Sequence, residues 1–140
     1  MVKAKDFWGY LCVDLEYRFF AGVACPGLLP LYKSMDPEIM HYVPAVNERV
    51  ALGLVSGVYA GGFKGGLLLD LNFMSDIQRF LNFNYEYKIP FIIIGYGDNK
   101  ANFDIPTIKF NKLTDLKKAD KMYEKELTPI LINIKEGVIS

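Results

Sequence analysis

The chain has 140 residues, of which 51% are hydrophobic, a size and composition typical of one domain with a buried core. Sixteen Lys and Arg offset sixteen Asp and Glu, so no net basic field exists to hold a nucleic-acid backbone, and nucleic acid is not an expected partner. The longest uncharged runs, residues 19–32 and 50–63, are shorter than the about 20 residues of a membrane span. Charged residues near the N-terminus argue against a signal peptide, so we expect a cytoplasmic protein without membrane contact.

Apolar runs alternate along the chain with segments of helical period, as in repeated βα units. Residues 5–17 predict a helix with Phe7, Leu11 and Leu15 on one face, and residues 28–35 predict a short helix that ends before Asp36-Pro37. The other expected helices are residues 48–62, 74–87 and 114–127, the last capped by Thr114. The expected strands are residues 19–23, 39–43, 67–71, 91–94, 107–110 and 129–134, and residues 95–100 are expected to form a loop.

This order of elements predicts a doubly wound α/β fold over residues 1–140, with no linker or internal repeat. We expect a mainly parallel sheet of six strands with helices on both faces. The unbroken apolar run at residues 91–94 predicts a central parallel strand. Ligands of such sheets bind at the carboxyl ends of the strands, where we expect Glu48 to lie at the N-terminus of its helix.

The helix that begins near Glu48 is the most informative segment. An acid in a first helical turn is favoured by the helix dipole, so the position of Glu48 alone has a purely structural explanation. Small residues leave one face of this helix nearly bare, so that another backbone or a flat ligand could approach: Gly53, Ser56, Gly57, Ala60 and Gly61. Tight packing within the chain would explain the same glycines, and the spacing alone leaves both explanations open.

The two cysteines form neither a Cys-x-x-Cys motif nor a metal-ligand spacing with His, so we expect two free thiols and no metal site in this chain. Cys12 lies in an apolar helical stretch and is expected in the core. Cys25 follows the first strand, where ligands meet an open sheet, and its role stays open. The only histidine, His41, lies in a strand and does not by its position pair with Cys25.

The segment around Glu48 resembles the helix that carries the catalytic glutamate in the pyrimidine-binding domain of thiamine diphosphate enzymes. In that superfamily a strand leads to a Glu at the start of a helix rich in Ala and Gly, followed by a Gly-rich turn, here Gly65-Gly66, and a further strand. The pattern is most similar to the short alpha subunit of sulfopyruvate and phosphonopyruvate decarboxylases. Its Gly-Val-Pro-x-Ser-Leu-Leu region resembles residues 22–31, and its Tyr-x-Ile-Pro region resembles residues 87–90.

The resemblance covers about residues 7–97 and implies a specific chemistry. Glu48 would share a proton with the pyrimidine ring of thiamine diphosphate and favour the form that generates the ylid, the electron sink for decarboxylating a small 2-oxo acid. Enclosure among Val, Leu and Gly residues is expected to suit Glu48 to this proton transfer. The other cofactor-binding residues that the resemblance implies are Pro26, Gly27, Asn72, Phe73 and Met74. The resemblance to sulfopyruvate decarboxylase also implies a role in coenzyme M biosynthesis.

The half of the site that binds Mg²⁺ and the diphosphate is incomplete in this chain. The family uses a Gly-Asp-Gly stretch and an Asn further downstream, and Gly97-Asp98-Asn99 resembles only the first half of this motif. The resemblance therefore implies a separate beta chain that holds Mg²⁺ and the diphosphate, in a homo- or hetero-oligomer.

Residues 70–76 depart from the Gln-Asn-Ser-Gly-x-Gly-Asn stretch of these decarboxylases. Phe73 and Met74 are bulky, and Asp70 and Asp76 place negative charge where a sulfonate or phosphonate would be repelled. Gly27 also stands where the family has Ser. Two hypotheses follow: a decarboxylase alpha subunit, or a diverged, non-catalytic homologue that binds a protein or another small molecule. An unrelated flavodoxin-like module leaves the Glu48 helix unexplained.

Overall fold

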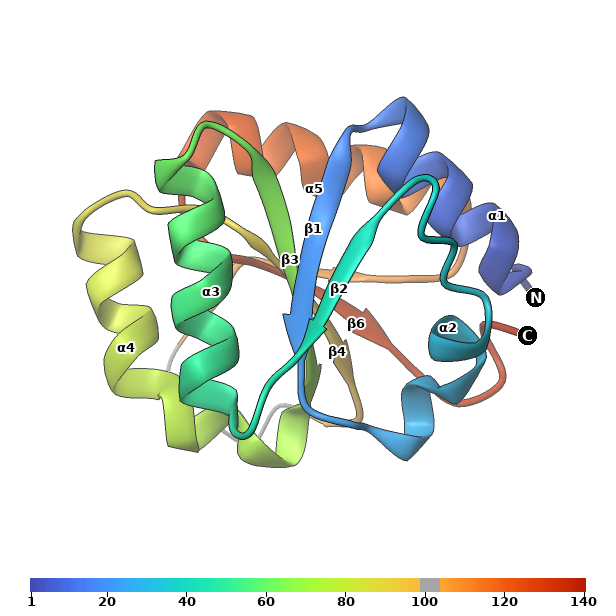
Figure 1. The fold of residues 1–140 in the computed structure, drawn as a ribbon, viewed down its shortest axis with the longest axis horizontal. Coiled ribbons are helices and arrows are strands. Elements are labelled where there is room, and N and C mark those ends of the chain that lie inside the picture. The colour runs from blue at the N-terminus through green and yellow to red at the C-terminus, as the bar shows by residue number, and fades with distance from the viewer. Residues whose placement is uncertain (99–103) are drawn as a thin grey trace.

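Six parallel strands form the central sheet of the computed structural model, which describes residues 1–98 and 104–140. The strand order is β2-β1-β3-β4-β6-β5, and each of the described ladders is parallel. The strands are β1 (Tyr17–Gly22), β2 (His41–Pro44), β3 (Lys64–Asp70), β4 (Ile92–Tyr96), β5 (Thr107–Lys109) and β6 (Ile130–Ile134). The predicted parallel sheet of six strands is confirmed, with β4 at its centre (Figure 1).

Helices cover both faces of the sheet, as predicted (Figure 1). The helices are α1 (Ala4–Trp8), which continues as a wide π-helical segment (Gly9–Asp14), α2 (Leu29–Lys33), α3 (Glu48–Ala60), α4 (Met74–Glu86) and α5 (Leu113–Glu126). Helices α3 and α4 pack on one face, and α1, α2 and α5 pack on the other. Two short 3-10 turns, Pro26–Leu28 and Leu71–Phe73, precede α2 and α4.

The central strands supply apolar side chains to both cores, because successive residues of a strand point to opposite faces. Ile92 and Ile94 of β4 pack with the α1, α2 and α5 side, whereas Phe91 and Ile93 pack with the α3 and α4 side. All four are at most 1% exposed. This two-sided burial explains why residues 91–94 form a continuous apolar run rather than an alternating one.

Strand β3 begins earlier than predicted, because Gly65 and Gly66 lie within it rather than in a turn. A Cβ atom on Gly66 would lie 2.7 Å from the ring of Phe20, and one on Gly65 would lie 3.1 Å from the carbonyl oxygen of Phe19. The neighbouring strand β1 therefore occupies the space that side chains would need. Glycine here permits close approach within the sheet.

The predicted cap of the last helix is also wrong. Thr114 lies inside α5, and the carboxylate of Asp115 forms the cap by accepting the backbone N–H groups of Asn111 (2.9 Å) and Lys112 (3.0 Å). A carboxylate in the first turn can reach back to the N–H groups that precede the helix, and its charge suits the helix dipole.

A buried polar cluster lies at the amino ends of β1 and β3. The hydroxyl of Tyr17 donates to Asp120 Oδ1 at 2.8 Å, and Lys64 Nζ donates to the same oxygen at 2.9 Å. Lys64 Nζ also donates to the carbonyl of Leu15 at 3.0 Å and lies 4.8 Å from the centre of the Tyr17 ring. Burial raises the pKa of Tyr17, and the charge of Asp120 raises it further. The two ionised groups of the cluster, Lys64 and Asp120, are thus paired with each other.

The two ends of the chain lie side by side (Figure 1). Val2 donates its N–H to the carbonyl of Val138, and Ser140 donates to the carbonyl of Val2, both at 2.9 Å. Within the part of the chain that the structure describes, no helix has the length and apolar character needed to cross a membrane.

Candidate functional site

The chain reverses its direction of travel across the sheet between β1 and β3. From β1 it moves outward to the edge strand β2, then passes back across β1 to form β3 and continues toward β4. Crevices at such a reversal, outside the carboxyl ends of the strands, are where open α/β sheets bind ligands. Residues 23–25, 45–47 and 71–73 leave β1, β2 and β3 at this edge, which makes it the place to look for a site.

Glu48 is the first residue of α3, at the carboxyl ends of the strands, as predicted. The side chain of Asn47 caps the helix by accepting the N–H of Val50 at 3.0 Å. Just before it, Ala45 donates its N–H to the carbonyl of Gly22 at 2.8 Å, which fixes the start of the helix against the end of β1. The sequence therefore places the Glu48 carboxylate at the positive end of a thirteen-residue helix.

The expected apolar enclosure of Glu48 is not found. Its side chain is half-buried and shares a hollow of about 330 Å³ with the polar side chains of Asn47, Arg49 and Asp76. The nearby apolar residues Val46 and Val50 are themselves 87% and 44% exposed. The prediction failed because the first turn of α3 projects beyond the ends of the strands, so this chain alone leaves Glu48 open to water.

The predicted site residues after β3 differ in what they offer a ligand. Asp70 accepts the N–H of Asn72 at 2.9 Å and so closes the turn that follows the strand. Asn72 is exposed, and the ring of Phe73 is 45% exposed. The side chain of Met74, by contrast, is fully buried in the core between the sheet and α4. Of the three predicted residues Asn72, Phe73 and Met74, the first two therefore present side chains at the surface and the third does not.

Pro26 and Gly27 lie in the turn after β1. A Cβ atom on Gly27 would lie only 2.2 Å from the ring of Tyr96, so glycine lets the end of β4 pack directly against this turn. This contact is a physical reason for glycine at position 27. The same residues line a hollow of about 210 Å³ that also includes Lys135.

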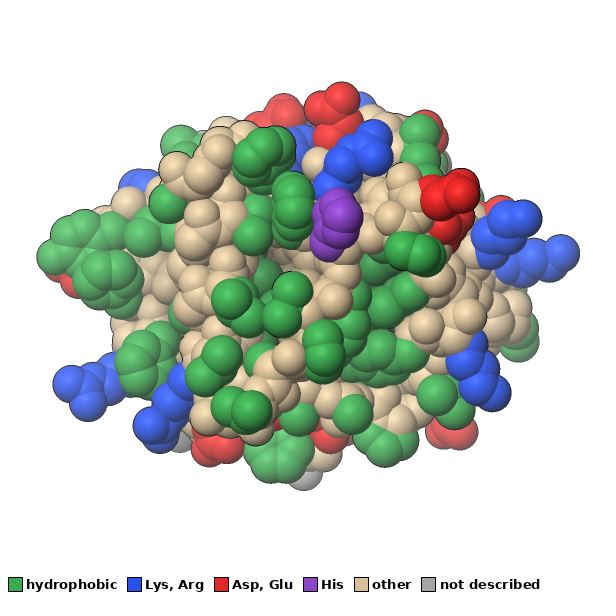
Figure 2. All heavy atoms as spheres, viewed as in Figure 1, with side chains coloured by type: hydrophobic (Ala, Val, Ile, Leu, Met, Phe, Trp, Pro, Cys, Tyr) green, Lys and Arg blue, Asp and Glu red, His purple; other side chains and the backbone are tan. Residues whose placement is uncertain are grey.

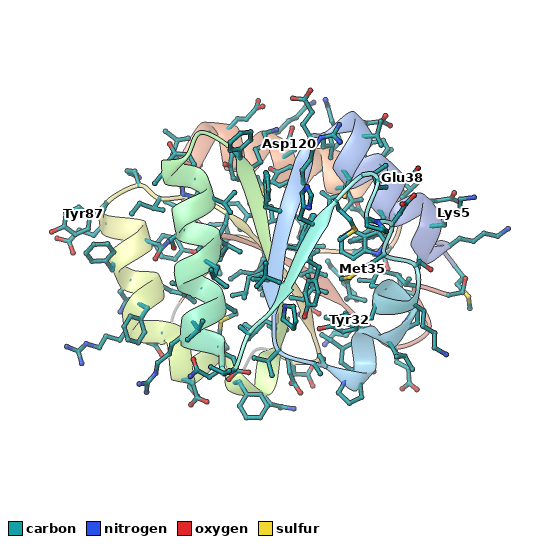
Figure 3. The ribbon with its side chains drawn as sticks, viewed as in Figure 1. Lys5, Tyr32, Met35, Glu38, Tyr87 and Asp120 are labelled. Carbon is teal, nitrogen blue, oxygen red and sulfur yellow. The ribbon has the colours of Figure 1, made fainter. Side chains whose placement is uncertain are left out.

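A larger, apolar hollow of about 500 Å³ lies between the ends of β1 and β2 and helix α2, and sequence reasoning missed it. Its lining residues are Ala24, Cys25, Pro26, Leu29, Tyr32, Tyr42 and Pro44. The hydroxyl of Tyr32 donates to the carbonyl of Val23 at 3.1 Å, and burial raises the pKa of both tyrosines. Figure 3 shows Tyr32 pointing from α2 toward the sheet. Apolar and aromatic residues spread over 21 positions gave no local signal for this hollow.

Cys25 lines this hollow and has no histidine to activate it. Burial raises the pKa of the Cys25 thiol, and the charge of Asp70 raises it further. His41 lies on the opposite face of β2, where its ring stacks on Phe19 with centroids 5.3 Å apart. The structure therefore does not bring Cys25 and His41 together.

The Gly97-Asp98 segment follows β4 at the same edge of the sheet. Lys135 pairs with the carboxylate of Asp98 and donates to the carbonyl of Gly97 at 3.0 Å. Asn99 and Lys100, the last residues of the expected loop, lie outside the described residues. Among residues 1–98 and 104–140, no group of three or more His, Cys, Asp or Glu side chains is placed to hold a metal ion.

Solved structures of larger enzymes share this fold, and two of them are described here. The 2-oxoglutarate:ferredoxin oxidoreductase from Magnetococcus marinus, solved with 2-oxoglutarate, coenzyme A and succinyl-CoA bound, has a TM-score of 0.72 at 10% identity over 98% of this chain. Benzoylformate decarboxylase from Polynucleobacter necessarius has a TM-score of 0.61 at 14% identity over 94% of this chain.

The chain corresponds to only 29% and 32% of the lengths of those two proteins, respectively. No protein-family model and no curated protein matches its sequence. At these identities the likeness shows the fold alone: the chain has the fold of one part of each of these larger enzymes.

Proposed function

We propose that this chain is an alpha-type, pyrimidine-binding subunit of a thiamine diphosphate-dependent 2-oxo acid decarboxylase. The observation that carries the proposal is the position of Glu48, which begins α3 at the carboxyl ends of a parallel sheet. The sequence resemblance assigns the catalytic glutamate to this residue. Both structural neighbours are named for reactions of 2-oxo acids, which supports the same enzyme class.

The residues of this chain fit the pyrimidine end of the cofactor. Glu48 offers a half-exposed carboxylate, and the exposed ring of Phe73 offers an apolar surface. The turn that carries Phe73 leads into the first turn of α4, whose Asp76 lines the same hollow as Glu48. A flat, uncharged ring with polar nitrogen atoms suits this combination of a carboxylate and an aromatic face.

The same hollow does not fit the diphosphate end. The carboxylates of Glu48 and Asp76 would repel a polyanion. Among the described residues, Arg49 is the one cation that lines the hollow, and it lies 5.7 Å from the centre of the Phe80 ring. We therefore assign Mg²⁺ and the diphosphate to a beta chain. The exposed side chains of Val46 and Val50 beside Glu48 support such a covering partner, because apolar residues at the mouth of a site gain from burial.

The proposed mechanism gives Glu48 one task. Thiamine diphosphate, when bound, supplies the electron sink for decarboxylation. The carboxylate of Glu48 would hold and return a proton at the ring, and the N-terminus of α3 would stabilise its ionised form. A partner that covers the hollow would exclude water and strengthen this interaction. Asp76 disfavours substrates with a second anionic group, so we propose the class of small 2-oxo acids and not sulfopyruvate in particular.

The alternative is a diverged, non-catalytic homologue that binds a protein or another small molecule. Met74 favours it, because the family has a residue there that lets the pyrimidine approach the backbone, whereas here a buried side chain fills the core. In that case Glu48 would serve only as a favourable first-turn acid.

Reconstitution with a partner separates the two proposals. The chain would be co-expressed with a candidate beta chain that carries Gly-Asp-Gly and a downstream Asn. Thiamine diphosphate binding would then be measured by calorimetry in the presence of Mg²⁺, and CO₂ release would be measured across a panel of 2-oxo acids. We expect weak or no binding to the isolated chain, with binding and decarboxylation in the complex. A complex that forms but binds no cofactor would support the non-catalytic alternative.

A further inference from the structure

The apolar hollow between the ends of β1 and β2 and helix α2 has the size of a small-molecule site. We call it the β2–α2 hollow. Its volume of about 500 Å³ exceeds that of the hollow beside Glu48, about 330 Å³. It also lies within the range of about 300–1,000 Å³ that is typical of ligand pockets. Figure 2 shows hydrophobic side chains over the surface between β2 and α2, with the Lys, Arg, Asp and Glu side chains in view lying outside this stretch.

The β2–α2 hollow is separate from the hollow that contains Glu48. Tyr32 and Tyr42, which line it, pack against the core on the α1, α2 and α5 side of the sheet. Helix α3, which begins at Glu48, packs on the opposite face. Of the described residues that the resemblance assigns to the cofactor, Pro26 alone lines the β2–α2 hollow. A molecule in this hollow therefore occupies a different place from one beside Glu48.

The walls of the β2–α2 hollow suit a flat ring. The rings of Tyr32 and Tyr42 have centroids 5.6 Å apart and an angle of 72° between their planes, so they form two walls that meet at a steep angle. The side chains of Pro26 and Pro44 add further apolar ring surface. A flat ring can lie against the face of one tyrosine and direct its edge at the face of the other, the arrangement that aromatic groups prefer.

The hydroxyl group of Tyr42 offers one polar contact. The hydroxyl of Tyr32 donates to the carbonyl of Val23 at 3.1 Å, and the hydroxyl groups of Tyr32 and Tyr42 are also hydrogen-bonded to each other. Because Tyr32 gives its one proton to Val23, Tyr42 is the donor in the pair of hydroxyls. The oxygen of Tyr42 can then accept a hydrogen bond from an N–H or O–H group of a ligand.

The charges around the β2–α2 hollow favour an uncharged ligand. Among the described residues, no Lys, Arg, His, Asp or Glu lines it, so an ionised group would lose its water without gaining a counter-charge. The charge of Asp70 raises the pKa of the Cys25 thiol at the wall, so the field of this carboxylate reaches the hollow. An anion would be repelled as well as desolvated. The carboxylate of a 2-oxo acid is therefore unsuited to this hollow.

We propose that the β2–α2 hollow binds a small, flat, uncharged ring compound that carries an N–H or O–H donor. The ring would pack against the tyrosine and proline side chains, and the donor would bond to the oxygen of Tyr42. A recess of this volume, with a hydroxyl and a thiol among its apolar walls, is typical of small-molecule sites rather than of flat protein interfaces. The proposal does not rest on the catalytic function proposed for Glu48.

Calorimetry of the full chain with four related compounds tests the ligand class. Indole is flat and uncharged and has one N–H; 1-methylindole lacks the donor, indole-3-acetate adds an anion, and tryptamine adds a cation. We expect indole to bind most tightly. Tyr42→Phe should raise the Kd for indole about 3–10-fold, the scale of one neutral hydrogen bond, and leave the Kd for 1-methylindole unchanged. Tyr87→Phe is the matched control, since Tyr87 is 60% exposed at the outer end of α4 (Figure 3).

Two further measurements locate the bound molecule. Because Cys25 lies at the wall of the hollow, saturating indole should slow its modification by a disulfide reagent. Ala24→Phe, at an exposed position of the same wall, should fill the hollow and abolish both indole binding and this protection. Circular dichroism would confirm that the variants fold.

A chain that binds none of the four compounds would overturn the proposal. So would binding that leaves the modification rate of Cys25 unchanged, since the molecule would then lie elsewhere. Tighter binding of tryptamine or indole-3-acetate than of indole would contradict the uncharged class, and equal binding of 1-methylindole would contradict the role of Tyr42. Because no beta chain and no thiamine diphosphate are present, these outcomes are independent of the decarboxylase proposal.

Discussion

Two acids at opposite ends of the strands differ in burial and in hydrogen-bond partners. At the amino ends, Asp120 is 6% exposed and accepts hydrogen bonds from Tyr17 and Lys64. At the carboxyl ends, Glu48 is half-buried, and no partner for its side chain is found among the described residues. In Figure 3, Asp120 lies near the top of the molecule, whereas Tyr32 lies lower, toward the carboxyl ends of the strands. A buried acid with its partners in place stabilises the fold, whereas an acid without them is available for a ligand.

The difference arises from what surrounds each end. Strand β3 starts at Lys64 and α5 passes over it, so the amino ends are covered by residues of this chain. At the carboxyl ends, Glu48 in the first turn of α3 lies in a hollow that Asn47, Arg49 and Asp76 also line, and Val46 and Val50 beside it are exposed. We therefore expect substitutions at the amino ends to change stability and substitutions at Glu48 to change activity.

The largest expected effect is that of Glu48→Gln in a reconstituted complex. The amide keeps the size of the side chain but cannot carry the proton, so turnover should fall about 10²–10⁴-fold, the scale of general acid–base catalysis. The melting temperature should stay close to that of the unmodified chain, since a neutral amide is no harder to bury than a carboxylate. Steady-state CO₂ release would measure this effect. Glu38→Gln, at an exposed position before β2, should leave both quantities unchanged.

Asp120→Ala should have the reverse pattern. Loss of the carboxylate leaves the Tyr17 hydroxyl and Lys64 Nζ without their shared acceptor, and Lys64 is only 24% exposed. We expect a loss of about 2–3 kcal/mol in the free energy of unfolding, since removing one member of a buried pair is costly. Urea denaturation would measure it. A loss below about 0.5 kcal/mol would mean that this cluster does not stabilise the fold.

The two thiols also lie in different surroundings. Burial raises the pKa of Cys12 to about 12, although Arg18 partly opposes the shift, and burial also raises the pKa of Cys25. Both thiols should react slowly with a disulfide reagent at pH 8, because the thiolate is the reactive form. Cys25, at the wall of an open hollow, should react before Cys12 in the core. Mass spectrometry of partly labelled protein would contradict this order if Cys12 were modified first.

The smallest effect concerns the Asp115 cap. Burial raises the pKa of Asp115, but hydrogen bonds from the N–H groups of Asn111 and Lys112 and from Lys118 outweigh it, so the pKa lies below its ordinary value of 3.8. The carboxylate therefore contributes stability that is fully present above pH 3.8 and is lost as the pH falls through the lower folded pKa. As the pH falls from neutral to strongly acidic, the free energy of unfolding should decrease less in Asp115→Asn than in the unmodified chain. Thermal melts along a pH series would reveal equal losses if the cap had no such role.

The parts of the fold that local pattern determines could be predicted from the sequence. The apolar run at residues 91–94 predicted strand β4, and the acid at the start of a helical pattern predicted the position of Glu48. Both predictions succeeded because hydrophobic periodicity and helix-start signals act over a few residues. The pairing of Lys64 with Asp120 joins residues 56 positions apart and depends on the finished topology. The exposure of Glu48 and the hollow beside Tyr32 and Tyr42 also depend on how far whole elements project, which no local pattern encodes.

Proton transfer at the cofactor is the step proposed for Glu48, and it can be measured directly. In the reconstituted complex, rapid quenching and proton NMR would follow exchange of the thiazolium C2 proton of bound thiamine diphosphate with D₂O, without any substrate. We expect fast exchange in the unmodified complex and exchange slowed about 10²–10⁴-fold in Glu48→Gln, while cofactor binding is retained. Equal exchange rates in the two complexes, with the cofactor bound in both, would contradict the catalytic role of Glu48.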